Sequence, residues 1–312
     1  MRPSGAARPS EMALALAQTC LTLTAPNPRV GCVLTSPDGD VIGAGHTQQA
    51  GGPHAEIMAL RYAQARGAST AGATAWVTLE PCSHHGRTGP CCDALIAAGI
   101  RKVVASLADP NPLVAGQGFA RLRAAGVEVE VGPGAAESRE LNLGFFSRMV
   151  RGTPWVRMKL AASLDGKTAL DNGASQWITA PAARADGHAW RARACAVLTG
   201  IGTVRDDDPL LDGRLAETAR QPHLVIVDSR LETPPGARLF GPRRRVLVYA
   251  ALDDPARRAE LEARGATVIV LPDATHARVD LPALLRDLAR REINELHVEA
   301  GHRLNGALVG AG

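Results

Sequence analysis

Several things are scarce in this 312-residue sequence, and each scarcity excludes a class of protein. Aromatic residues make up only 3%, and the one tight basic run is Arg243-Arg244-Arg245, which we interpret as a solvated loop. A nucleic-acid-binding surface needs basic patches and stacking aromatics, so we expect no nucleic-acid partner. No segment approaches the ~18 continuous apolar residues of a membrane-spanning helix, so we expect no membrane partner either.

Signals for secretion are also lacking. The apolar stretch Met12–Ala17 is shorter than the apolar core of a signal peptide, which has ~7–15 residues, and it fits an amphipathic helix better. The six cysteines do not resemble a disulfide framework, because half of them lie near a metal motif, while Cys20, Cys32 and Cys195 have apolar surroundings typical of a core. We therefore predict a cytoplasmic protein.

Length and composition indicate a globular protein with two domains. Hydrophobic residues make up 46% and charged residues 21%, and the net charge of +4 is small and dispersed. A chain of this length suits two domains of about 150 residues. We place them at residues 1–146 and 147–312, with a linker over Ser147–Pro154.

The most informative motif is His54-Ala55-Glu56 followed by Pro81-Cys82 and Cys91. A catalytic zinc needs three protein ligands and an open position for water, whose pKa it lowers from ~15.7 to ~7. Glu56 is close enough in sequence to pass a proton from that water to a departing amine. The pattern is the mark of zinc nucleobase deaminases, although there the two cysteines are separated by two residues and here by eight.

Two points about this motif stay open from the residues alone. Cys91 and Cys92 are equivalent candidates for the third ligand. The alternative to a catalytic centre is a structural Cys/His site, but such a site would want a fourth ligand and leaves Glu56 without a role.

The first half alternates between helical and strand patterns, which predicts a three-layer α/β/α domain. His54 and Cys91 fall at the starts of two helices, whose dipoles favour ionised thiolates. The expected helices are 11–22, 54–66, 90–98 and 117–125, and the expected strands are 30–34, 41–45, 74–79, 102–106 and 127–131.

These residues, together with Thr78–Thr88 and Asp109-Pro110-Asn111-Pro112, resemble the bifunctional riboflavin-biosynthesis deaminase/reductase family. The resemblance implies a cytidine-deaminase-like domain with Zn²⁺ on His54, Cys82 and Cys91 and with Glu56 as the catalytic proton shuttle.

The same resemblance implies that Asn27 binds the pyrimidine and that Arg87 meets the substrate phosphate, which suits a guanidinium. One departure is Thr47, which stands where the family often has a histidine. The sequence leaves open whether His46 takes over that contact.

In the second half, two strand patterns run into glycine. Ala196–Thr199 precedes Gly200-Ile201-Gly202-Thr203, and Leu296–Ala300 precedes Gly301. Such junctions can bind a phosphate on backbone amides, or they can be simple turns. A full G-x-G-x-x-G followed by an acidic residue is missing, which argues against an ordinary dinucleotide-binding fold.

Ser163–Gly166, Ser175–Thr179, Asp207–Pro209 and Val298–Gly301 resemble the reductase half of the same family, a dihydrofolate-reductase-like α/β domain that uses NADPH. Lys159 and Asp207 would handle protons in the reduction. The cofactor would contact Ala161, Trp177, Thr203, Asp207, Ser229, Gly301, His302, Arg303, Leu304, Asn305, Gly306 and Ala307. The substrate would contact Ser175, Arg191, Leu211, Arg214 and Glu299.

Three departures concern this half. His302 and Arg303 replace a frequent Pro-Thr pair after Gly301, and Asp212 replaces a frequent threonine. The sequence stops at Gly312, whereas family members continue through further strands. We therefore expect the reductase half to be truncated and to reduce its substrate poorly or not at all, and we expect a homodimer if that half is complete.

The function predicted from the whole sequence is riboflavin biosynthesis. The phosphoribosylated diaminopyrimidinone would be deaminated hydrolytically, and NADPH would then reduce the ribosyl group to a ribityl chain. One alternative is a zinc deaminase of another base or nucleoside, with a nucleotide-binding C-terminal domain. Another is a non-catalytic zinc-binding protein. Ammonia release that a chelator abolishes would exclude this alternative.

Overall fold

The computed structural model describes residues 7–83, 89–112, 114–172, 174–175, 177–216, 218 and 220–311. The chain divides into two compact units, unit 1 from Met1 to Arg151 and unit 2 from Gly152 to Gly312. Within the described residues, every helix is too short or too polar to cross a membrane.

Unit 1 is built on a five-stranded sheet with the order β2-β1-β3-β4-β5. The first two strands form an antiparallel hairpin, β1 is also antiparallel to β3, and β3, β4 and β5 are parallel. The strands are β1 (Gly31–Thr35), β2 (Val41–His46), β3 (Thr74–Val77), β4 (Lys102–Ala105) and β5 (Glu128–Val131).

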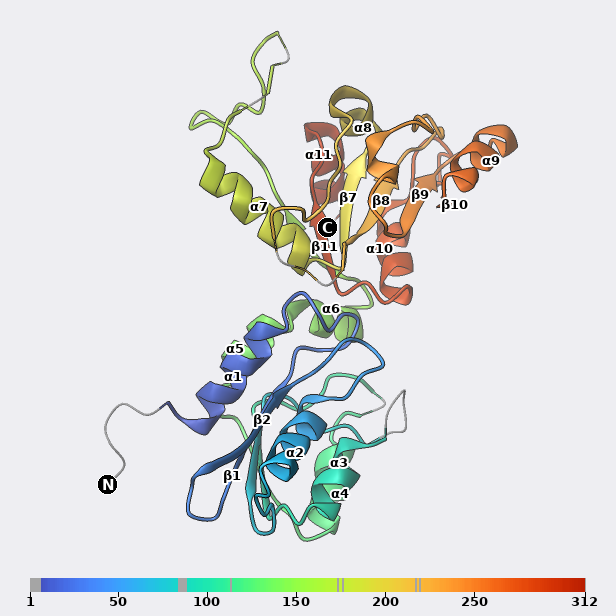
Figure 1. Ribbon diagram of the computed structural model, residues 1–312. Helices are drawn as coiled ribbons and strands as arrows, with labels where there is room; N and C mark the ends of the chain where they lie inside the picture. Colours follow the sequence, from blue (N-terminus) through green and yellow to red (C-terminus); the bar gives the residue numbers. More distant parts are fainter. Residues whose placement is uncertain are drawn as a thin grey trace. The chain divides into compact units, whose positions relative to one another are not determined.

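Helices cover both faces of this sheet, which confirms the predicted three-layer α/β/α arrangement (Figure 1). On one face α1 packs against β1 and contacts α5, and on the other α2, α3 and α4 lie side by side. The helices are α1 (Pro9–Thr19), α2 (Ala55–Ala65), α3 (Cys91–Ala97), α4 (Gln117–Ala124), α5 (Ala135–Leu141) and α6 (Leu143–Arg151).

Glycines bring two of these helices unusually close to the sheet. A Cβ atom on Gly31 would lie 1.9 Å from the carbonyl oxygen of Ala13 in α1. A Cβ atom on Gly45 would lie 2.5 Å from the Cβ atom of Met58 in α2. Because real Cβ atoms do not approach backbone so closely, helix packing at both points requires glycine.

The predicted linker over Ser147–Pro154 is wrong in its first part. Residues 147–151 complete α6, whose Phe145 and Phe146 are buried in the core of unit 1. The helix ends at Arg151 because Gly152 adopts a positive φ of 69°, a usual way for a helix to stop. The boundary between the units therefore lies after Arg151 rather than after residue 146.

Unit 2 contains a six-stranded sheet with the order β10-β9-β8-β7-β11-β6, and every pair in it is parallel. Its central strands are continuous apolar runs because helices bury them on both faces. The strands are β6 (Trp155–Met158), β7 (Ala196–Gly200), β8 (His223–Val227), β9 (Val246–Ala250), β10 (Ala266–Val270) and β11 (Glu295–Val298).

The helices of unit 2 cover the two faces of this sheet. On one face, α7 reaches β11 through ion pairs, and Leu261 of α9 joins a core with Val246 and Val248. On the other face, Tyr249 donates a hydrogen bond to Asp287 of α10. The helices are α7 (Pro181–Arg193), α8 (Ile201–Asp207), η1 (Arg238–Phe240), α9 (Pro255–Ala263), α10 (Leu281–Arg290) and α11 (His302–Gly310).

Candidate active sites

Three soft or borderline donors meet in unit 1. His54 is the N-cap residue of α2, Cys91 is the first residue of α3, and Cys82 lies in the loop between β3 and α3. The Nδ1 atom of His54 is 3.6 Å from the Sγ atom of Cys82 and 3.5 Å from that of Cys91. All three donor atoms lie within 4.8 Å of one another.

The spacing of these donors fits zinc. In a tetrahedral site with Zn–S of ~2.3 Å and Zn–N of ~2.0 Å, sulfur and nitrogen ligands lie roughly 3.6 Å apart. Three donors also leave the fourth position open, as a catalytic site requires. The group could therefore hold zinc as it stands.

The structure separates the two neighbouring cysteines that the sequence left equivalent. Cys91 faces His54, whereas the thiol of Cys92 donates to the carbonyl oxygens of Pro81 (3.1 Å) and Gly118 (3.6 Å). Burial raises the pKa of Cys92 to about 12, so this thiol stays protonated. Cys92 therefore behaves as a core residue.

Hydrogen bonds prepare Cys82 for metal binding. Hydrogen bonds hold the pKa of Cys82 well below its usual range. The thiol of Cys91 has the largest lowering effect, followed by the imidazole of His54 and the backbone N–H of Cys91 at the start of α3. The amide nitrogen of Cys91 is 3.3 Å from the Cys82 sulfur. The start of a helix thus stabilises a thiolate, as predicted.

Glu56 lies in the first turn of α2, two residues from His54, and is only 3% exposed. Burial, reinforced by the negative charge of Cys82, raises the pKa of Glu56 to about 7. A carboxyl group with a pKa near neutrality can both accept and release a proton. Glu56 stands outside the donor group that could hold a metal.

Glu80 is a structural residue that our sequence reasoning missed. Its buried carboxylate accepts backbone N–H groups of Asp109 (3.1 Å), Gly116 (2.9 Å), Gly118 (2.9 Å) and Phe119 (3.2 Å). These bonds fix the loop before α4 and the first turn of α4 next to the chain segment that carries Cys82. An acidic residue within an otherwise apolar strand end was the one signal available.

The predicted substrate residues of unit 1 are partly visible. Asn27 is half-buried in the turn before β1, where its backbone exchanges hydrogen bonds with Thr24. The side chain of Thr47 is buried, and the ring of His46 contacts the side chain of Gln48. Among the described residues, neither side chain forms a hydrogen bond with Glu56. Arg87 lies outside the described residues.

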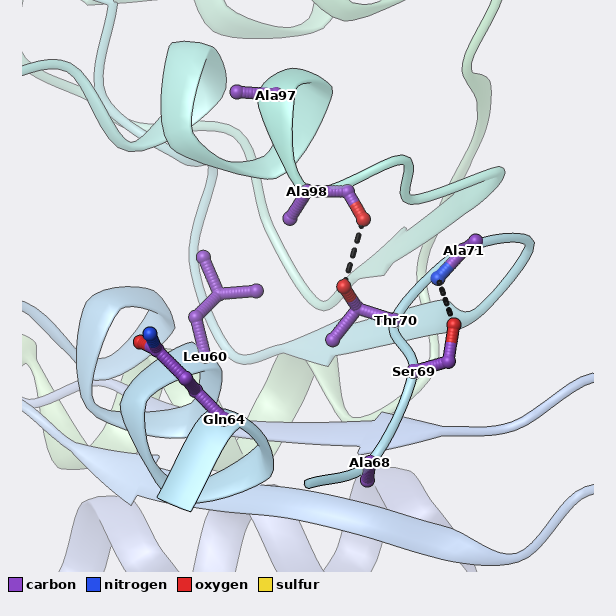
Figure 2. Close-up of a pocket in the computed structure, with 8 residues that line it drawn as sticks. All are labelled: Leu60, Gln64, Ala68, Ser69, Thr70, Ala71, Ala97 and Ala98. Carbon is purple, nitrogen blue, oxygen red and sulfur yellow. Dashed lines mark hydrogen bonds between the residues drawn. The ribbon is translucent and has the colours of Figure 1, made fainter. Parts of the chain in front are cut away.

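A pocket of about 420 Å³ also opens on unit 1, but it is a poor candidate for chemistry (Figure 2). It lies at the C-terminal ends of α2 and α3, whereas the metal-type donors lie at their N-terminal ends. Its polar groups pair internally, since Thr70 donates to the carbonyl oxygen of Ala98. None of the eight residues that line it is ionisable.

In unit 2, several predicted cofactor residues gather at the carboxyl ends of the parallel strands. Thr203 lies in α8 directly after β7, Ser229 follows β8, and Gly301 is the N-cap residue of α11 after β11. The order of strands reverses between β7 and β11, which makes this a topological switch point. Ligands of open α/β sheets bind at such a point.

Residues 301–307 occupy the start of α11, and the side chain of Leu304 packs against Gly200. His302, Arg303, Gly306 and Ala307 are exposed, and Asn305 is buried, where it donates to the carbonyl oxygen of Ala300. The start of α11 therefore presents backbone N–H groups at the switch point, in the way that suits a phosphate.

Glu299 is the centre of an ion-pair group just after β11. Arg191 of α7 binds both of its carboxylate oxygens, with 2.8 Å between Nη2 and Oε2, and the Nζ atom of Lys159 is 3.8 Å from Oε2. Burial alone would raise the pKa of Glu299, but the interactions with Arg191 and His297 together outweigh burial and lower the pKa. The structure thus brings together Lys159, Arg191 and Glu299.

Hydrogen bonds from α7 fix the loop from Asp208 to Arg214, which includes the predicted substrate residues Leu211 and Arg214. Arg191 and His188 contact the carbonyl oxygen of Asp212, and Leu211 adopts a positive φ of 50°. The side chain of Asp212 pairs with Arg214 at 2.5 Å. The same arginine that binds Glu299 therefore also positions this loop.

The interpretation of Arg243-Arg244-Arg245 as a solvated loop is wrong for its middle residue. Arg244 is half-buried and donates to the carbonyl oxygens of Leu210, Leu211 and Leu239. Burial lowers its pKa to about 10. Arg244 precedes the buried Val246 by two residues, and this alternation could have indicated that it faces inward.

Other predicted residues of the reductase half stand apart from this group. The chain between β6 and α7 is an arm, largely exposed where it is described, that carries Ala161, Ser175 and Trp177 (Figure 1). Trp177 is 71% exposed and stacks on Arg184. Asp207 is exposed at the end of α8, and its side chain makes no hydrogen bond or ion pair with any described residue.

Comparison with known proteins places these two sites in a family. Residues 6–107 match the cytidine and deoxycytidylate deaminase zinc-binding region, and residues 154–312 match the RibD C-terminal domain. The riboflavin biosynthesis protein RibD of Escherichia coli is 46% identical, over 96% of this chain and 83% of that protein. The Aquifex aeolicus protein of the same name is 41% identical, over 94% and 80%. The chain belongs to the RibD family.

Solved structures agree with this RibD assignment. Acinetobacter baumannii RibD has a TM-score of 0.87 and 41% identity, covering 97% of this chain and 82% of that one. A Thermotoga maritima protein, named a diaminohydroxyphosphoribosylaminopyrimidine deaminase/5-amino-6-(5-phosphoribosylamino)uracil reductase, has a TM-score of 0.81 and 37% identity, covering 93% and 79%. The fold predicted from the sequence, a deaminase-like domain followed by a reductase domain, is therefore confirmed.

Proposed function

We propose that this RibD-family protein catalyses two consecutive steps of riboflavin biosynthesis. The first is hydrolytic deamination of 2,5-diamino-6-(5-phosphoribosylamino)pyrimidin-4(3H)-one. The second is NADPH-dependent reduction of the ribosyl group of the product to a ribityl chain. The observation that carries the proposal is the meeting of His54, Cys82 and Cys91 beside a buried glutamate that is not one of the donors.

In the deaminase half, His54, Cys82 and Cys91 would hold the zinc ion. When bound, zinc lowers the pKa of a coordinated water molecule to ~7. Glu56 takes a proton from the attacking water and delivers it to the amine. A carbon–oxygen bond forms, the carbon–nitrogen bond breaks, and ammonia leaves. Asn27 and Arg87 bind the pyrimidine and the phosphate of the substrate.

In the reductase half, Thr203, Ser229 and Gly301 at the carboxyl ends of β7, β8 and β11 would hold the cofactor. NADPH, when bound, supplies the hydride that reduces C1′ of the ribosyl chain. The ammonium group of Lys159, held near Glu299, supplies the accompanying proton. Glu299, Arg191, Leu211 and Arg214 hold the substrate, with the arginines suited to its phosphate.

Some assignments from the sequence stay predictions. Ser175, Trp177 and Ala161 lie on the exposed arm, so their contacts with ligand require that the arm approach the switch point. Asp207 as a proton handler has no partner among the described residues to support it. The homodimer also stays a prediction.

The test separates metal binding from proton transfer. Glu56→Gln is expected to retain one equivalent of zinc but to lose at least ~100-fold in ammonia release, because general acid–base catalysis of this kind contributes ~10²–10⁴-fold. Cys82→Ser and Cys91→Ser are expected to lose zinc, measured by elemental analysis of the purified protein. Cys92→Ser is the matched control and should keep both zinc and activity.

Retention of zinc by Cys91→Ser together with its loss from Cys92→Ser would overturn the ligand assignment. Ammonia release that survives in Glu56→Gln would remove the proton shuttle from the mechanism. Product analysis by mass spectrometry, with and without NADPH, distinguishes the two steps from deamination of another base.

A further inference from the structure

A buried histidine lies directly beneath the ion-pair group of the reductase half. His297 in β11 is 1% exposed, and its side chain points to the same face of the sheet as Glu299, two residues further along. The register pairs His297 with Arg157 of β6 and with Val197 of β7, so the ring lies among side chains of three adjacent strands.

The ring has one polar neighbour within reach. Its Nε2 atom is 3.4 Å from the Oε1 atom of Glu299, slightly longer than a well-formed hydrogen bond. This approach is not a formed hydrogen bond, and neither Nε2 nor Nδ1 has a hydrogen-bond partner in the described part of the chain. An apolar side chain would fill this position without burying two polar nitrogens, so packing alone does not account for the imidazole.

The carboxylates above and below the ring already face cations. Glu299 already faces Arg191 and Lys159. Glu295, at the other end of the same row, faces Arg193 and Arg157. What His297 can add is direction, because an Nε2–H donor would fix the rotation of the Glu299 carboxylate.

We propose that His297 is a positioning residue for the reduction. The 3.4 Å approach lets a small adjustment of the ring bring its Nε2–H group onto the Oε1 atom of Glu299 as a donor, and Glu299 in turn holds Arg191 and Lys159 in place for the substrate. This inference rests on the role of Glu299 in the function proposed above. His297 acts through Glu299 and does not touch the substrate.

The kinetic test compares His297→Leu, which keeps a buried apolar side chain, with His297→Gln, which restores an N–H donor. His223→Leu is the matched control, because His223 also has a buried, unpartnered Nδ1 atom but lies at the amino end of β8, away from the switch point. NADPH oxidation is measured with the deaminated intermediate. NADPH affinity is measured by fluorescence titration, and ammonia release reports that unit 1 is intact.

His297→Leu is expected to lower kcat/KM for the intermediate by about 10-fold, the usual effect of losing one charge-assisted hydrogen bond. NADPH affinity should stay within about twofold in the same comparison. His297→Gln should recover part of the loss, and His223→Leu should resemble the unmodified protein. In a Glu299→Gln background, His297→Leu should have no further effect, because the two residues act as one unit.

Nitrogen NMR of histidine-labelled protein gives a reading that does not depend on catalysis. If His297 positions Glu299, its ring is the tautomer with hydrogen on Nε2. The His297 signal is identified because it is missing from His297→Gln and shifted in Glu299→Gln. Finding the Nδ1–H tautomer, or additive kinetic effects of the two substitutions, would overturn it. If Glu299→Gln itself leaves reduction unchanged, the role proposed for Glu299 fails as well. If Glu299→Gln impairs reduction and His297→Leu does not, only the positioning role fails.

Discussion

At the scale of single residues, buried carboxylates organise both halves of this protein. Glu299 holds an arginine and a lysine at the switch point, and Glu80 holds four backbone N–H groups, two in the loop before α4 and two in the first turn of α4. Each therefore fixes residues that are distant in sequence. Substituting such a residue should cost more than the loss of a surface charge, because it leaves several buried groups unpaired.

We expect the substitution Glu80→Gln to destabilise unit 1. The amide would present N–H donors where Glu80 now accepts backbone N–H groups, so the loop before α4 would lose part of its anchor. We expect unit 1 to be destabilised by about 3 kcal/mol or more. Deamination should also fall, because Cys82 is two residues away. Thermal unfolding of the zinc-loaded protein measures the change, and the exposed Glu140→Gln in the same unit is the control.

Asp109 predicts a pH dependence of stability. Burial, partly offset by a hydrogen bond from the backbone of Asn111 and reinforced by the charge of Glu80, raises the pKa of Asp109 to about 7. The unfolded value is ~3.9. Because the folded pKa is the higher one, the stability linked to protonated Asp109 is complete below pH ~4 and is lost as the pH rises towards ~7.

Asp109→Asn removes this titration and should flatten the fall in stability between pH ~4 and ~7. Across this pH range, the difference in unfolding free energy between Asp109→Asn and the unmodified protein should change by about 1.4 kcal/mol for each unit by which the folded and unfolded pKa values of Asp109 differ. Denaturant unfolding of unit 1 at several pH values measures it. Parallel curves for the two proteins would mean that Asp109 is ionised in the folded state.

At the scale of elements, close backbone contacts set how the helices of unit 1 lie on their sheet. Gly31 is the sharpest case, since an added Cβ atom would lie 1.9 Å from a backbone oxygen of α1. Gly31→Ala should therefore displace α1 and destabilise unit 1 by roughly 3 kcal/mol or more, within the range of overpacked core sites. Gly187→Ala in α7 is the control. It meets open space and should stabilise its helix by about 0.5–1 kcal/mol.

Elements were predictable from the sequence where their signals are local. The donor group was found because His54 and Cys91 begin helices and Cys82 follows a strand, all of which the pattern of apolar residues indicates. The choice of Cys91 over Cys92 needed the family resemblance, since neighbouring positions in a helical turn look alike in sequence.

Long-range contacts were the part that sequence could not supply. Arg244 binds carbonyl oxygens of a loop more than thirty positions earlier, and the partners of Glu80 begin twenty-nine positions later. The linker prediction failed for a related reason. Phe145 and Phe146 are buried in the core of unit 1, and this tertiary burial extends α6 to Arg151.

At the scale of the whole molecule, the two proposed catalytic sites belong to units with separate cores. Removal of zinc with a chelator should therefore abolish ammonia release. NADPH oxidation with added deaminated intermediate should retain most of its rate. Restoring zinc should restore the first activity. Lys159→Met should give the opposite pattern, because Lys159 belongs to unit 2. A parallel loss of both activities on chelation would show that the metal also supports unit 2.

The arrangement of strands in unit 2 bears on how the chain is made. β6 comes first in this unit but lies at the edge of the sheet, and in the described part of the chain its one neighbour is β11, the last strand. One edge of β7 also stays unpaired until β11 has been synthesised. During synthesis at ~5–20 residues per second, β6 would stay unpaired for roughly 10–30 s after it leaves the ribosome. Unit 1 can complete its sheet in that interval, so a ribosome-bound chain should acquire the zinc site well before the switch point exists.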